Sequence, residues 1–130
     1  MDTSRLKALP LFEGVSDEDL DKIAPFVSEV SVSEGKHLVD EGRFAYEFFV
    51  IKEGSAAVTR GGRTLNELGP GDFFGELGLH GGEGRRTASV VATSPLTVVV
   101  MLARDFAAME RAMPEVAEAI RTKCYEDRQD

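Results

Sequence analysis

The sequence has 130 residues, of which 42% are hydrophobic, a size and composition typical of one domain with a substantial core. Its formal net charge of −8 argues against a general nucleic-acid surface, because duplex binding rests on many Lys and Arg contacts to phosphates. The single cysteine, the lack of an apolar run of about 18 residues and the polar N-terminus predict a cytoplasmic protein without an internal disulfide or a membrane span.

The N-terminal part is predicted to be helical over residues 3–9 and 16–27, with Pro10 and Gly14 between the two helices. Ser16 is a good N-cap, and the acidic residues after it suit the positive end of the helix dipole. Apolar residues then recur at spacings of three and four, at Leu20, Ile23, Ala24 and Val27. The acidic group can also be read as a metal site, but a capped and solvated helix end is the preferred interpretation. It consists of Asp17, Glu18, Asp19 and Asp21.

The middle of the chain has the hydrophobic period of strands, with glycines between short segments. Residues 48–51 and 97–102 are continuous apolar runs of strand length, which predicts strands buried on both faces. Gly61 and Gly62 predict a hairpin with a two-residue turn. Many short strands with regular turns indicate a β-sandwich or a jelly-roll barrel over residues 28–102.

A helical period returns at Ala103 and predicts two helices over residues 103–127, divided at Pro114. The apolar face of the first helix contains Phe106, Met109, Ala112 and Met113. The apolar face of the second contains Val116, Ala117, Ile120 and Cys124. The expected fold is therefore mainly β with flanking helices.

The stretch over residues 75–88 joins several glycines to a pair of arginines, a composition suited to holding a small anion. Gly75 and Gly78 allow the backbone to approach a ligand, and a helical turn at this point would direct free N–H groups at a phosphate. Arg86 adds a planar fork that contacts phosphate oxygens two at a time. Glu76 is a poor partner for phosphate because both are negatively charged. We therefore expect its carboxylate to accept a hydrogen bond from a hydroxyl of an attached sugar.

The run Gly-Glu-Leu-Gly-Leu, followed after a gap by Arg-Thr-Ala-Ser-Val, resembles the phosphate-binding cassette of cyclic nucleotide-binding domains. Such domains occur in catabolite-activator-type regulators, cyclic-nucleotide-dependent kinases and cyclic-nucleotide-gated channels. The resemblance implies that Glu76 takes the ribose 2′-hydroxyl and Arg86 the cyclic phosphate. Arg85 is the alternative phosphate ligand, and Arg86 is preferred because it directly precedes Thr-Ala. The resemblance also implies phosphate donors among the backbone amides of Leu77, Gly78 and either Thr87 or Ala88.

The order of elements is similar to that of this family over about residues 5–125. It implies a single cyclic nucleotide-binding domain over residues 1–130. Its parts are an N-terminal helical bundle (3–27), a jelly-roll β-barrel or double-stranded β-helix (28–102) with the cassette (75–88), and hinge and lid helices (103–127).

The resemblance also implies a conformational switch. When the phosphate draws the cassette inward, Leu79 is expected to change its contacts with the hinge helix around Phe106. The last helix would then close over the purine, with Arg121, Lys123 and Tyr125 as candidates to contact the base. A solvated helix end is the alternative interpretation of these three residues.

Cyclic AMP is the ligand that the resemblance favours. In similar domains a hydroxyl directly after the cassette arginine can contact the phosphate or a guanine amino group, so Thr87 also allows cyclic GMP; a β-branched residue that opens a strand is the alternative interpretation of Thr87. No other cofactor is expected. The chain would be a sensor for a protein effector, either alone or as the regulatory piece of a longer protein. Dimerisation through the last helix is a further option.

Three other kinds of function are alternatives for a chain of this composition. A ligand-free interaction domain would keep the barrel without binding a nucleotide. A cupin-like metalloenzyme would need several histidine ligands, and the chain has only His37 and His80, on distant segments. An iron–sulfur sensor would need more cysteines than Cys124. The sequence shows no catalytic constellation, so an enzyme is not expected.

Overall fold

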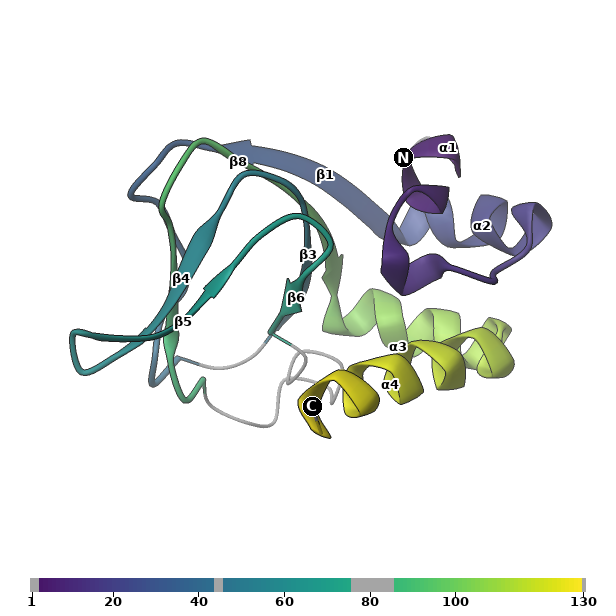
Figure 1. Cartoon of the computed structure of the whole chain (residues 1–130). Coiled ribbons are helices and arrows are strands. Elements are labelled where there is room, and N and C mark those ends of the chain that lie inside the picture. The colour runs from purple at the N-terminus through teal and green to yellow at the C-terminus, as the bar shows by residue number, and fades with distance from the viewer. Residues whose placement is uncertain (1–2, 44–45, 76–85, 130) are drawn as a thin grey trace.

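The computed structural model describes residues 3–43, 46–75 and 86–129, with the side chains of the last helix described as far as Thr122. A β-sandwich lies beside a group of helices from both ends of the chain (Figure 1). The helices are α1 (Thr3–Lys7), η1 (Pro10–Phe12), α2 (Asp17–Ile23), η2 (Ala24–Phe26), α3 (Ala103–Ala112) and α4 (Pro114–Gln129). In the described part of the chain, no helix is both long and apolar enough to cross a membrane.

The N-terminal helices are shorter than expected. Ser16 caps α2 as predicted, because its side chain accepts a hydrogen bond from the Asp19 N–H at 3.2 Å. The helix expected over 16–27 ends at Ile23, and a 3-10 turn containing Pro25 follows before the first strand begins at Val27. Proline lacks the N–H that would continue the helix, which explains why α2 ends before Val27.

The strands form two antiparallel sheets of four, in the orders β1-β8-β3-β6 and β2-β7-β4-β5. They are β1 (Val27–Val32), β2 (His37–Val39), β3 (Glu47–Glu53), β4 (Ala56–Arg60), β5 (Arg63–Leu68), β6 (Phe73–Phe74), β7 (Ser89–Ala92) and β8 (Leu96–Leu102). The jelly-roll prediction is confirmed, with one correction: the two sheets do not close into a barrel in the described residues. The edge strands are β1 and β6 in one sheet and β2 and β5 in the other, and β2 and β6 have only three and two residues.

Strand β3 contributes to two cores, as its continuous apolar run predicts. Phe48 and Val50 pack with the helices, whereas Phe49 and Ile51 pack between the sheets. Successive side chains of a strand point to opposite faces, so β3 joins the sandwich to the helices, as β8 does with Val98 and Val99.

The predicted hairpin turn is also confirmed. Gly61 and Gly62 join β4 to β5 with φ angles of 57° and 81°, the positive values that a type I′ turn requires. The predicted division at Pro114 is confirmed as well, because α3 ends at Ala112 and α4 begins with the proline.

An ion cluster fastens the N-terminal helix to the sandwich. Glu29 on β1 accepts a hydrogen bond from Lys52 Nζ of β3 at 2.7 Å and pairs with Arg5 of α1. The hydrogen bond from Lys52, with the positive charges of both neighbours, lowers the pKa of Glu29 from its ordinary value of 4.5.

Candidate ligand-binding site

A pocket of about 390 Å³ lies where strands of both sheets meet the ends of the cassette. Apolar side chains make most of its wall, and the only charged side chain among the described lining residues is Arg86. The lining consists of Val39, Val58, Asn66, Leu68, Phe73, Phe74, Gly75, Arg86, Thr87, Ala88 and Val90. The volume is in the range that small-molecule sites occupy.

Arg86 is held in this pocket by both its backbone and its side chain. Its N–H donates to the Arg43 carbonyl at 2.7 Å, and its own carbonyl accepts from the Gly42 N–H at 2.8 Å. Its Nη2 donates to the Glu47 carbonyl at 2.5 Å, and the residue is only 8% exposed. A guanidinium fixed in a desolvated position is well prepared to bind an anion, because charge interactions are stronger away from water.

Gly75 provides the space for this arginine. Its φ is 79°, and a Cβ there would lie 2.9 Å from Arg86 Nη1 and 2.9 Å from the Glu47 carbonyl oxygen. The sequence predicted that Gly75 allows close approach to a ligand. In the structure, the approach that it allows is to Arg86 itself.

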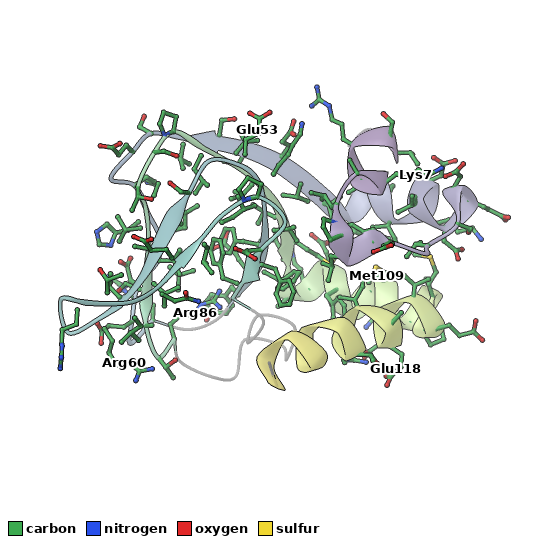
Figure 2. The ribbon with its side chains drawn as sticks, viewed as in Figure 1. Lys7, Glu53, Arg60, Arg86, Met109 and Glu118 are labelled. Carbon is green, nitrogen blue, oxygen red and sulfur yellow. The ribbon has the colours of Figure 1, made fainter. Side chains whose placement is uncertain are left out.

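Thr87 and Ala88 continue the pocket wall after Arg86. Thr87 is exposed and Ala88 half-buried. The Thr87 carbonyl accepts a hydrogen bond from Arg60 Nε at 2.8 Å. Sequence reasoning missed Arg60, because only the pairing of β4 with β7 brings it to the cassette. Figure 2 shows Arg60 and Arg86 at the same end of the sandwich.

The middle of the cassette lies outside the described residues. It includes Glu76, Leu77, Gly78, Leu79 and Arg85, whose roles stay predictions. On α4, the side chains of Lys123 and Tyr125 are also outside the described part.

Phe106 and Arg121 are brought together by α3 and α4. Phe106 is buried in the helix-side core, and the Arg121 guanidinium lies over its ring, 5.2 Å from the centroid. Arg121 also pairs with Glu110 and, at 3.6 Å, with Glu118. In this structure Arg121 therefore links the two C-terminal helices, and its contact with a base stays a prediction.

A second hollow and the described histidine offer fewer groups that could bind a ligand. A hollow of about 380 Å³ is lined mainly by residues of β1, β2, β3 and β8, including Val30 and Val98. It shares no lining residue with the Arg86 pocket, although Glu47, whose carbonyl accepts from Arg86, lines it. His37 at its rim contacts Asp40, with 2.9 Å between Nδ1 and Oδ1. Among the described residues, no three His, Cys, Asp or Glu side chains gather where they could hold a metal ion.

Comparison with known proteins identifies the family. The family model described as Cyclic nucleotide-binding domain matches residues 29–112, more than half of the chain. The chain belongs to this family.

The chain is similar both to curated proteins and to solved structures. It is 32% identical to the Cyclic AMP receptor protein of Thermus thermophilus, over 86% of this chain and 54% of that protein. It is 34% identical to a cGMP-dependent protein kinase of Drosophila melanogaster, over 68% of this chain and 10% of that protein. Among solved structures, the N-terminal domain of a transcriptional regulator from Streptomyces coelicolor A3(2) has 30% identity and a TM-score of 0.77, covering 99% of this chain and 94% of that one. The chain thus spans about half or less of these two curated relatives.

Proposed function

We propose that this domain binds a cyclic nucleotide in the Arg86 pocket and thereby regulates a protein effector. The observation that carries the proposal is the buried Arg86 guanidinium on the wall of a pocket of about 390 Å³, at the end of a cassette-like sequence. Burying a cation is costly unless it is hydrogen-bonded, and a buried anion-binding group in a pocket is a typical functional feature.

The guanidinium suits a cyclic phosphate, which carries a single negative charge. The group has five N–H donors in a planar fork, and the bond to the Glu47 carbonyl uses one of them. A planar fork of this kind contacts phosphate oxygens two at a time. Lysine, with a single ammonium, lacks this geometry.

Cyclic AMP is the proposed ligand, with cyclic GMP as the alternative. The name of the Thermus relative supports the first and that of the Drosophila relative the second. Thr87 is exposed at the pocket, where its hydroxyl is available to the phosphate or to a guanine amino group.

A regulatory role is supported by contacts that join the pocket to the hinge helix. Arg86 bonds the Glu47 carbonyl, and the neighbouring Tyr46 carbonyl accepts from the Ala103 N–H at 2.8 Å. Ala103 is the first residue of α3. A phosphate bound to Arg86 therefore acts on the segment from which α3 starts. It can shift the position of the C-terminal helices only as far as its affinity differs between their ligand-free and ligand-bound arrangements.

The test is the melting temperature of the purified chain with cyclic AMP, cyclic GMP or linear AMP. A ligand at about one hundred times its dissociation constant stabilises the native state by about 2.7 kcal/mol, enough to raise the melting temperature by several degrees. We expect one cyclic nucleotide to produce this shift and linear AMP to produce none. Arg86→Lys should lose most of the shift, whereas Arg63→Ala, which removes an exposed charge on β5, should retain it.

No shift with either cyclic nucleotide at millimolar concentration would contradict the proposal and favour a ligand-free interaction domain. An equal shift with wild type and Arg86→Lys would show binding that does not use the Arg86 fork.

A further inference from the structure

Arg60 contacts the cassette from outside the pocket. It is the last residue of β4, and its exposed side chain donates from Nε to the Thr87 carbonyl at 2.8 Å. The ladder places it there, because Thr59 pairs with Ser89, two residues after Thr87. Arg60 is not among the residues that line the pocket, whereas Thr87 and Ala88 are.

This bond fixes the orientation of one peptide group. The Thr87 carbonyl and the Ala88 N–H belong to the same planar trans peptide, so they point in opposite directions. When Arg60 holds the carbonyl on its own side, the Ala88 N–H is directed away from Arg60, and Ala88 lines the pocket whereas Arg60 does not. A cationic donor on the carbonyl also polarises the peptide and strengthens its N–H as a donor.

The hairpin that carries Arg60 is itself fastened to the cassette exit. The Gly61 N–H donates to Glu41 Oε1 at 3.1 Å, and the Glu41 N–H donates to Ser89 Oγ at 3.0 Å. Glu41 thus joins the turn after Arg60 to the first residue of β7. These contacts limit the freedom of Arg60 relative to Thr87.

We propose that Arg60 is a positioning residue for the phosphate: it aims and polarises the Ala88 amide as a phosphate donor without touching the ligand. The inference rests on the proposed function, because it assigns a second source of phosphate affinity to the same pocket. It predicts a loss of affinity from a residue outside the pocket, with little change in the stability of the ligand-free protein.

The experiment compares wild type with Arg60→Ala, Arg60→Lys and Arg63→Ala. Arg63 is paired with Arg60 across the hairpin, so its removal takes the same charge from the same turn. Two quantities are measured: the dissociation constant for cyclic AMP or cyclic GMP, and the amide 1H–15N signal of Ala88 without ligand. Thermal unfolding without ligand checks that each variant is folded.

We expect Arg60→Ala to weaken binding about tenfold, equal to about 1.4 kcal/mol, and to move the Ala88 amide signal. Arg63→Ala should change affinity less than about twofold and leave that signal in place, because it alters only the long-range field. Arg60→Lys should recover part of the affinity, since its ammonium can still donate to the carbonyl.

Equal weakening by Arg60→Ala and Arg63→Ala would overturn the inference in favour of general charge attraction. Unchanged affinity in Arg60→Ala would also overturn it. If wild type binds no cyclic nucleotide, the proposed function fails, and the phosphate role of Arg60 fails with it. The Ala88 signal in Arg60→Ala then still shows whether Arg60 orients this peptide.

Discussion

At the scale of single residues, Arg86 is the one charged side chain that the structure buries among the described residues. The sequence predicted Arg86 as the anion ligand from the glycine-rich stretch and from its resemblance to the cassette, which favoured Arg86 over Arg85, and the structure puts Arg86 in a pocket. Its bonds to Arg43, Gly42 and Glu47 could not be predicted, because they depend on how two distant loops meet. Arg60 was missed for the same reason, because the spacing of residues along the chain does not determine the register in which β4 pairs with β7.

Glu29 gives a prediction on the pH dependence of stability. Its folded-state pKa is lowered, so its contacts stabilise the protein above its ordinary pKa of 4.5, and this contribution is lost as the pH falls through the folded-state pKa. We expect Glu29→Gln to lower the free energy of unfolding by about 0.5–1 kcal/mol at pH 7. The difference from wild type should shrink below about pH 4.5.

Urea unfolding at several pH values measures this difference. Glu53→Gln is the matched control, because it removes an exposed carboxylate of β3. If the difference between wild type and Glu29→Gln stayed constant from pH 7 to pH 3, the carboxylate would not be the source of the stability.

At the scale of elements, local chemistry predicted the turns and breaks, whereas the end of α2 follows from Pro25 together with the pairing of the next strand. The Gly61-Gly62 turn and the break at Pro114 are local, and both are confirmed. The apolar spacing through Val27 suggested a helix to that residue, yet Val27 pairs with Met101 in the first sheet. Pairing with β8 overrides the helical period there.

The contact between α3 and α4 gives a prediction at this scale. Arg121 lies over Phe106 and pairs with Glu110, so Arg121→Ala removes a cation–π contact and an ion pair between the helices. We expect a loss of about 1 kcal/mol in stability. Amide hydrogen exchange should rise in α4 more than in the sheets, because the variant loosens this contact locally.

Hydrogen exchange followed by mass spectrometry measures this effect. Arg111→Ala, which removes an exposed cation from the last turn of α3, is the control and should leave exchange in α4 as it is in wild type. Unchanged exchange in α4 of Arg121→Ala would mean that the apolar face alone holds the helix.

At the scale of the whole molecule, two hydrophobic cores share strand β3, and each supports a different part of the protein. The core between the sheets supports the pocket, and the core on the helix side holds α3 and α4. The mainly β architecture with flanking helices was predictable from periodicity. The separation of the two sheets in the described residues was not, because strand pairing depends on contacts between distant segments rather than on the hydrophobic period.

The central claim is that the Arg86 fork binds a cyclic phosphate, and titration calorimetry of the purified chain with cyclic AMP and cyclic GMP tests it most directly. We predict one saturable site per chain for at least one of them, with an affinity at least about tenfold lower in Arg86→Lys, a loss of about 1.4 kcal/mol. No binding heat from either nucleotide at millimolar concentration, at two temperatures, would contradict the account, as would equal affinity in the variant.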